Sequence, residues 1–362
     1  MDNLRIPTEP IGSIPRPPEL VAGLKANAAG TLSAAELSIL FDRAVQDTIR
    51  RFEATGSPVI TDGEQTKPSF ATYPLHGMKT LDPDGVAIPF ADGHTRQLPK
   101  ITGGPFRYQQ KAASFYNHAK KYARMPVKQA VISASALSLL YPPEAIPGYS
   151  REAFMADLLN EHEADIRGCL AAGAYNVQID FTEARLAVKL DPGKGLLRSF
   201  VGLNNQVLER FTDRERNRLG VHTCPGGDQD STHSADVDYA ELLPLLFEMK
   251  VKNFYLQYAS EKAKRHVLQT VKRSLKPSHH VFLGVIDVLD PRIETPEEIR
   301  DLILEAADYI PPAQLGTTDD CGFSPFADDT STSRDTAFAK ITARLKGTRL
   351  AQDVLGKKKA VG

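Results

Sequence analysis

Short apolar segments alternate with longer segments of helical periodicity along this chain, and the alternation constrains the fold more than any other feature. Eight segments have strand character, at residues 10–13, 58–62, 127–133, 176–180, 219–223, 253–257, 280–286 and 314–318. Strands that alternate with crossover helices form parallel sheets. Eight such units close a (β/α)8 barrel, so the sequence predicts this α/β fold, the TIM barrel.

Capping residues mark where several predicted helices begin. Ser33 lies three residues before Glu36, the spacing of a capping box, ahead of an apolar-periodic run through Phe52. Thr295 precedes Pro296 and two glutamates, which is typical of a helix N-terminus. Further helices are expected over residues 150–172, 238–249 and 334–345.

The segment from residue 65 to about 125 is rich in Gly and Pro and lacks clear periodicity. We interpret it as an insertion after the second strand, over the mouth of a single barrel domain that comprises residues 1–362. A short flexible tail is expected over about 350–362. The alternative fold, a doubly wound open sheet, needs a glycine-rich phosphate turn after an early strand. The first strand here is followed by Ser13-Ile14-Pro15-Arg16 instead.

The composition restricts the partners of the chain. With 44 basic and 45 acidic residues, the net charge of −1 gives no general affinity for nucleic acid or acidic lipid. No apolar run reaches the roughly 18 residues of a membrane span, and the N-terminal residues lack a signal-peptide pattern. Three cysteines are too few for a disulfide framework. We therefore expect a cytoplasmic protein that acts on small molecules, of undetermined oligomeric state.

Polar side chains follow the predicted strands at the end where barrel enzymes carry their sites. They are Ser13, Asp62 with Glu64, Ser133 with Ser135, Asp180, His222 with Cys224, Gln257, Asp287, and Asp320 with Cys321. The pattern indicates one convergent site. Plainer roles are also open, since Asp180 could cap a helix, and Asp62 and Glu64 could be turn residues.

The sharpest local motif is His222-Thr223-Cys224. Side chains two residues apart in an extended segment point the same way, so His222 and Cys224 could share one metal ion. A thiolate from another strand end, Cys321, would give the three-ligand pattern of catalytic zinc, with one position left for substrate. Sulfur donors with one imidazole favour zinc over magnesium or calcium.

The cysteines have two other interpretations. Buried free cysteines are common core residues, and Cys169, in an apolar helical segment, is expected to be one. Cys224 and Cys321 could be core residues as well. Alternatively, His222 or His233 could activate Cys224 as a nucleophile, although no local signature supports such a pair.

Taken together, these residues resemble the C-terminal catalytic barrel of cobalamin-independent methionine synthase, a family that includes short, single-barrel forms. The resemblance covers about residues 8–345. The matching segments occur in the family's order and are Ile11-Gly12-Ser13, Asp62-Gly63-Glu64, Val177-Gln178-Ile179-Asp180, His222-Thr223-Cys224 and Asp320-Cys321-Gly322.

The resemblance implies a role for each matching residue. These are His222, Cys224 and Cys321 as ligands of Zn²⁺, Glu64 and Asp180 at the amino group of homocysteine, and Ser13 at its carboxylate. In that family, zinc holds the substrate thiol as a thiolate that attacks an alkyl donor. A free thiol, with a pKa near 8.5, is mostly protonated at neutral pH, and a Zn²⁺ ion deprotonates it. A zinc-dependent S-methyl- or alkyltransferase is expected.

The chain departs from the family mainly on the donor side. Gln257 stands where the family has a glutamate ligand, so at most a weak fourth ligand is expected there. Leu289 falls where the family has the histidine that protonates the folate leaving group. Tyr141 falls near a tryptophan that faces the pterin, and is expected at the substrate pocket. The large N-terminal half of the folate enzyme has no counterpart here. The methyl donor is thus a folate or another carrier.

Two other functions fit parts of the pattern. Epoxyalkane:coenzyme M transferases, a related branch, also use a His-x-Cys…Cys zinc site. Coenzyme M has a sulfonate and no amine, so Glu64 and Asp180 weigh against it, and Arg16 and Arg185 are the candidate sulfonate ligands. The second alternative is a non-catalytic barrel with a structural or sensing zinc. Zinc removal distinguishes that case, because structural zinc contributes directly to folding.

Overall fold

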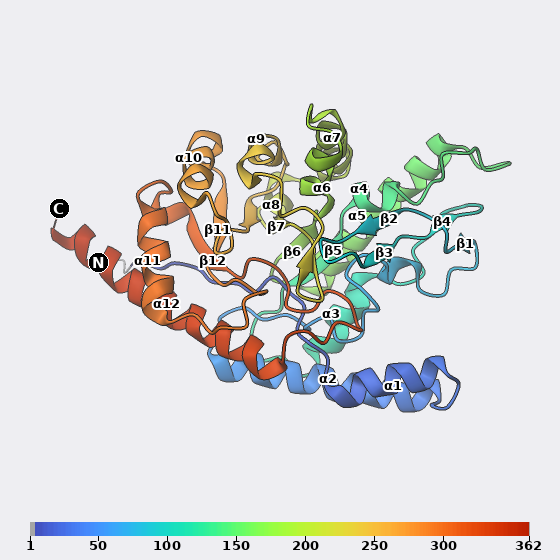
Figure 1. Cartoon of the computed structure of the whole chain (residues 1–362), viewed down its shortest axis with the longest axis horizontal. Coiled ribbons are helices and arrows are strands. Elements are labelled where there is room, and N and C mark those ends of the chain that lie inside the picture. The colour runs from blue at the N-terminus through green and yellow to red at the C-terminus, as the bar shows by residue number, and fades with distance from the viewer. Residues whose placement is uncertain (1–3, 362) are drawn as a thin grey trace.

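A parallel sheet forms the centre of the computed structural model, which describes residues 4–361 (Figure 1). Its strand order is β12-β11-β10-β7-β6-β5, and every neighbouring pair is parallel. The strands are β5 Gln129–Ile132, β6 Val177–Asp180, β7 Leu219–Thr223, β10 Asn253–Leu256, β11 His280–Gly284 and β12 Leu315–Thr318. Nearly all their residues are buried, as expected for a parallel sheet covered on both faces.

Single bridges extend the sheet at both edges. Thr8 pairs in parallel with Thr317 of β12, and Ile60 pairs in parallel with Val127, just before β5. The first strand was predicted at residues 10–13, but its bridge lies earlier because the backbone bonds to β12 are made by residues 7 and 9. The other seven predicted strand segments lie where the alternation predicts them.

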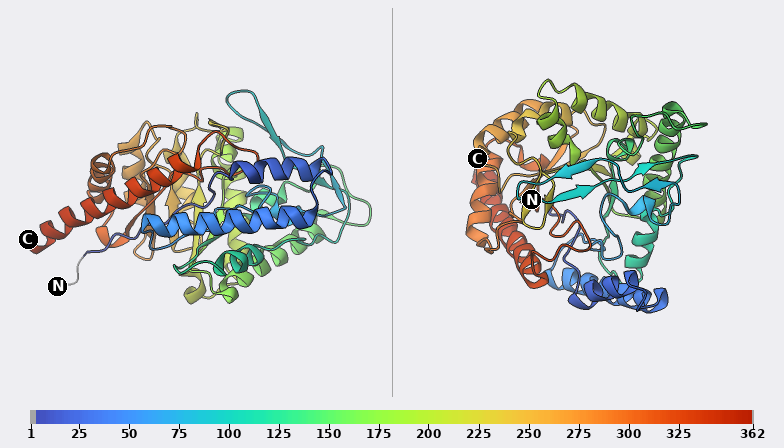
Figure 2. Two further views of the ribbon diagram at one scale, coloured as in Figure 1. Left: turned by 90° about the horizontal axis from the view of Figure 1, so that it is seen from below. Right: turned by 45° about the vertical axis from the view of Figure 1, so that its right-hand side comes forward.

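Contacts between the two added segments close the ring. Thr61 Oγ1 donates to the Gly12 carbonyl at 2.8 Å, and Ile14 N donates to the Gly63 carbonyl at 3.0 Å. Eight parallel segments in a closed ring, with helices outside, confirm the predicted (β/α)8 barrel (Figure 2).

Helices surround the barrel, and the capping predictions are confirmed. Ser33 and Glu36 form a reciprocal capping box, as do Thr295 and Glu298, and Ser150 caps its helix. The helices are α1 Pro18–Ala28, α2 Ala34–Thr55, α3 Ala112–Lys120, α4 Ala134–Ser138, α5 Arg151–Ala172, α6 Glu183–Leu190, α7 Gly195–Leu208, α8 Asp213–Arg216, α9 Leu243–Leu246, α10 Lys264–Ser274, α11 Pro296–Ala307 and α12 Arg334–Val361. Within the described part of the chain, none of them has an apolar stretch long enough to cross a bilayer.

Two helix predictions need correction. Residues 238–249 form a 3₁₀ turn, Tyr239–Glu241, followed by the short α9, rather than one helix. Pro244 explains the break, because it has no N–H to donate to the carbonyl of Ala240. The expected tail over about 350–362 lies mostly in α12, whose helical backbone runs to Val361.

The segment 65–125 contains two small antiparallel sheets. Strands β1 Leu81–Asp82 and β4 Lys100–Ile101 pair, and between them β2 Ala87–Pro89 pairs with β3 Thr95–Gln97. In Figure 2, right, the β2–β3 hairpin (teal) crosses the centre of the ring of helices. Helix α3, which the sequence pattern did not indicate, then leads the chain back to β5.

Arg96 of β3 fixes the β2–β3 hairpin to two loops of the barrel mouth. Its guanidinium binds Asp228, which is fully buried, and Asp328 at 3.0 Å, and it lies 4.2 Å from the centre of the Phe326 ring. Ala91 N also donates to the carbonyl of Thr232 at 3.0 Å. Asp228 and Thr232 belong to a hairpin formed by β8 Gly227–Asp228 and β9 Ser231–Thr232.

Arg96→Gln is expected to release the β2–β3 hairpin. The substitution leaves the buried Asp228 carboxylate without its bidentate partner, at a cost of about 2 kcal/mol. Amide hydrogen exchange over residues 87–97 should become faster than in the wild type. Arg292→Gln is the matched control, because Arg292 pairs with Glu298 on the exposed surface. Unchanged exchange in Arg96→Gln would show that the ion pairs do not hold the hairpin.

Candidate metal centre and substrate pocket

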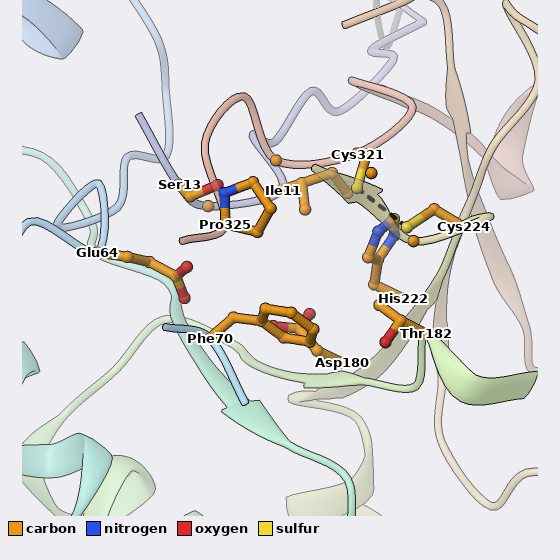
Figure 3. A pocket seen from close by; sticks show the side chains of 14 residues that line it. Ile11, Ser13, Glu64, Phe70, Asp180, Thr182, His222, Cys224, Cys321 and Pro325 are labelled. Carbon is orange, nitrogen blue, oxygen red and sulfur yellow. Dashed lines mark hydrogen bonds between the residues drawn. The ribbon is translucent and has the colours of Figure 1, made fainter. Parts of the chain in front are cut away.

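A cavity at the carboxyl ends of the barrel strands gathers side chains from five loops (Figure 3). Six residues predicted from the sequence line it: Ser13, Glu64, Asp180, His222, Cys224 and Cys321. Phe70, Thr182 and Pro325 complete much of the remaining wall. In Figure 3, the imidazole and the two thiols lie on one side, the Glu64 carboxylate lies across the cavity, and Asp180 lies between them behind the Phe70 ring.

His222, Cys224 and Cys321 form a compact group of metal-ligand atoms. These atoms all lie within 4.8 Å of one another, and the two Sγ atoms are 3.0 Å apart. That separation exceeds the roughly 2.05 Å of a disulfide, and all three cysteines of the chain are free. β7 and the residue after it provide His222 and Cys224, while Cys321 follows β12 from the far end of the sequence.

The hydrogen bonding of His222 leaves one ring nitrogen available. Nδ1 lies 3.2 Å from the carbonyl oxygen of Tyr255, which can only accept, so Nδ1 carries the proton. Nε2 is buried and has no hydrogen-bond partner among residues 4–361. Metal-binding histidines are commonly held in one tautomer in this way. One imidazole and two thiols therefore fit a zinc ion.

The neighbouring thiol disfavours the ionised form of Cys321. The contact with Cys224, together with burial, raises the pKa of Cys321 well above its usual range. Without a cation, the Cys321 thiol stays protonated at neutral pH. A bound divalent ion reverses this balance, because it stabilises the thiolates directly.

A buried lysine, Lys67, lies behind the two carboxylates and outside the cavity lining. Glu64 has a left-handed backbone, with φ of 55°, and its side chain accepts from Lys67 Nζ at 2.8 Å. Asp180 accepts from Gln178 Nε2 at 2.7 Å. Burial, and then the nearby Glu64, raise the pKa of Asp180 to about 6. Lys67 was not predicted from the sequence, where its only signal was its position three residues after Glu64.

Ser13 lies where the loop after β12 turns back over the cavity. Its Oγ accepts from Ser324 N at 3.2 Å. Only glycine fits at position 322, because a Cβ there would lie 2.2 Å from Ser13 Oγ. The close approach brings the hydroxyl to the cavity wall beside Cys321.

The two arginines considered as sulfonate ligands are both occupied. Arg16 is buried and donates to four backbone carbonyls, including those of Glu64 at 2.7 Å and Lys67 at 3.0 Å. Arg185 is buried beside Glu261, which it contacts at 2.7 Å. Neither side chain lines the cavity.

Two sequence-predicted site residues lie outside the cavity. The Tyr141 hydroxyl donates to the carbonyl of Tyr149 at 2.8 Å, so this ring belongs to the 141–149 loop and not to the pocket. The Gln257 amide accepts from Arg185 at 3.3 Å and donates to Ser260 Oγ at 2.6 Å. Both polar atoms of Gln257 are therefore engaged away from the three metal-ligand residues.

Comparison with known proteins identifies the family. The profile described as the catalytic domain of cobalamin-independent synthase matches residues 6–337. The chain belongs to this family. It is 25% identical over 375 residues to a methionine synthase of Sulfurisphaera tokodaii, covering 99% of this chain and 96% of that protein. A methionine synthase of Saccharolobus solfataricus is 23% identical over 362 residues, with 98% and 97% covered.

Solved structures show the same fold. The B12-independent methionine synthase of Shewanella sp. W3-18-1, in complex with selenomethionine, superposes with a TM-score of 0.74 at 19% identity, covering 97% of this chain and 98% of that one. A putative vitamin-B12-independent methionine synthase from Listeria monocytogenes gives 0.71 at 19% identity, with 97% and 99% covered. The resemblance seen in the sequence is confirmed, and the family assignment makes this protein a methyl-transferring enzyme.

Zinc content is expected to depend on the three clustered residues. His222→Ala and Cys321→Ser should each weaken zinc binding by at least about a hundredfold, since even the outer partners of zinc ligands contribute about 10–100-fold. Cys169→Ala is the matched control, because Cys169 is a buried thiol that does not line the cavity. Metal analysis after dialysis against a chelator of known affinity gives the result. Equal zinc retention in all three variants would contradict the assignment.

Proposed function

We propose that the enzyme is a zinc-dependent S-methyl- or alkyltransferase that activates homocysteine or a similar amino-acid thiol. The observation that carries this proposal is the buried, unpartnered Nε2 of His222 beside Cys224 and Cys321, in one cavity with two carboxylates. The curated relatives named methionine synthase support the same chemistry. The selenomethionine complex of the Shewanella protein is consistent with an amino-acid pocket in this fold.

His222, Cys224 and Cys321 would hold the zinc ion, and three protein ligands leave a position open for substrate. When bound, zinc supplies the positive charge that keeps the substrate thiol deprotonated at neutral pH. His222 contributes a lone pair on Nε2 because the Tyr255 carbonyl fixes the proton on Nδ1. Phe70 and Pro325 form an apolar part of the cavity wall.

Glu64 and Asp180 would bind the ammonium group of the substrate. Lys67 balances one of these two negative charges, so the pair retains room for one more cation. An ammonium group completes the charge balance, and it also offsets the burial and the repulsion from Glu64 that raise the pKa of Asp180. Ser13 and the neighbouring backbone lie where a carboxylate can be bound.

The two alternatives are less consistent with the geometry. An epoxide-opening transferase for coenzyme M needs a free cation for the sulfonate, but Arg16 and Arg185 are both bound elsewhere. A purely structural zinc has four protein ligands. Gln257, the expected fourth group, is held by Arg185 and Ser260.

X-ray absorption at the zinc edge tests thiol activation. Adding homocysteine should raise the number of sulfur neighbours at about 2.3 Å from two to three. The control is 4-hydroxy-2-aminobutyrate, homoserine, which has the same amine and carboxylate but no thiol. An unchanged zinc shell with homocysteine would overturn the proposed function.

The carboxylates should determine selectivity for amino-acid thiols. Glu64→Gln and Asp180→Asn are each expected to weaken homocysteine binding by about tenfold or more, since a hydrogen bond between charged groups is lost. Binding of 4-mercaptobutyrate, which is homocysteine without its amine, should change little. Calorimetric titration of both thiols into the zinc-loaded variants measures the two effects. Equal losses for the two thiols would exclude an ammonium site at these residues.

A further inference from the structure

A second cavity adjoins the metal-centre cavity. It encloses about 150 Å³, and Phe70 and Thr182 line both cavities. Its floor comes from α6, and its roof is the β2–β3 hairpin that Arg96 fixes over the barrel mouth. Most of its wall is apolar, and Val86 and Leu190 at its rim are exposed to solvent.

Glu183, the first residue of α6, is the acidic side chain among the residues that line this cavity. The side chain is buried, with 6% of its surface exposed. Ser133 and Ser135 both donate to its Oε1, the first at 2.6 Å. Oε2 is buried and has no hydrogen-bond partner within residues 4–361.

The surrounding bonds determine where a proton on Glu183 resides. Ser133 Oγ accepts from Ala136 N at 3.0 Å, and Ser135 Oγ accepts from Asn204 Nδ2 at 2.7 Å. The hydrogens of both serine hydroxyls are therefore free to point at Oε1. Because Oε1 is held as an acceptor, the acid form of Glu183 carries its proton on Oε2.

Burial favours the acid form near neutral pH. It raises the pKa of Glu183 to about 7, with a smaller contribution from the charge of Asp180 in the same direction. Two other titratable groups line the cavity. Burial lowers the pKa of His233 to about 4, so it is neutral, and Arg96 is paired with Asp228 and Asp328.

We propose that Glu183 is the general acid for the alkyl donor, and that the donor is an N-alkyl or O-alkyl compound whose apolar body occupies the second cavity. This inference rests on the proposed function. Leu289, close to Gly227 at the first cavity, has no proton to give. Glu183 lines the second cavity, and Thr182, the residue before it, lines both cavities, so the acid lies next to the junction of the two.

The substrate thiolate attacks the alkyl carbon, a C–S bond forms, and the bond from that carbon to nitrogen or oxygen breaks. The leaving atom takes the proton from Oε2 of Glu183, which becomes a carboxylate and is reprotonated by solvent. A sulfonium donor needs no such proton, because it leaves as a neutral thioether.

Infrared spectroscopy tests the protonation state without relying on turnover. The difference spectrum between the wild type and Glu183→Gln should contain a carboxylic-acid band that disappears as the pH rises through about 7. Other buried acids cancel in this difference. A Glu183 that is already a carboxylate at pH 6 would overturn the proposal.

Donor dependence tests the catalytic role. In zinc- and homocysteine-loaded protein, Glu183→Gln should slow methyl transfer from N5-methyltetrahydropterin by about a hundredfold or more. Transfer from dimethylphenylsulfonium should change little. For the wild type, the rate with the N-methyl donor should fall as the pH rises through about 7, because the acid form is lost, whereas the sulfonium rate should not fall there.

The matched control is Leu186→Ala, which enlarges the same cavity without touching the Glu183 hydrogen bonds. It should raise KM for the N-methyl donor. At saturating donor, the ratio of the transfer rates from the N-methyl and sulfonium donors should stay as in the wild type. If Glu183→Gln slows methyl transfer from both donors equally, Glu183 has a structural role and is not the general acid. If X-ray absorption shows the zinc–thiol bond but the wild type transfers no methyl group from the N-methyl donor, the proposed donor class is wrong and the proposed function stands. Loss of that bond would instead overturn the proposed function.

Discussion

Closure of the barrel between its first and last strands is the constraint on which the site depends. The bridge between Thr8 and Thr317 places the loop that begins at Ser13 beside the loop that carries Cys321. On the other side of the sheet, Asp180 and His222 are register partners in β6 and β7. Residues from both ends of the chain therefore converge by strand pairing, which brings His222, Cys224 and Cys321 together.

Strand periodicity and ligand chemistry were sufficient to predict the eight strands, the helix caps and the group His222, Cys224 and Cys321. These features are local, or follow from the rule that parallel strands present their carboxyl ends at one rim. Tyr141 and Gln257 were misplaced because a side chain's direction depends on partners that are distant in sequence. Tyr141 bonds to its own loop, and Gln257 is held by Arg185 from α6.

The charges around the first cavity support the proposed amino-acid substrate. Three buried groups, Glu64, Asp180 and Lys67, leave a net negative charge beside the cavity. Buried charges need partners, and a lysine three residues from Glu64 supplies one without filling the space between the carboxylates. The sequence alone could not show this, because a lysine is usually a surface residue and the burial of Lys67 is visible only in the structure. The ammonium of a substrate is the remaining complement.

The two cavities are mechanically linked through the hairpin that covers the second one. Arg96 lines the second cavity and binds Asp228, which lies four residues after Cys224 in the loop that follows β7. Between them, Gly226 packs so closely on His233 that a Cβ would lie 1.8 Å from Nε2. The ion pair between Arg96 and Asp228 therefore joins the roof of the apolar cavity to the loop that carries Cys224. His94 Nε2, 3.0 Å from Asp228, and Ala91 N, which donates to the carbonyl of Thr232, add to the same connection.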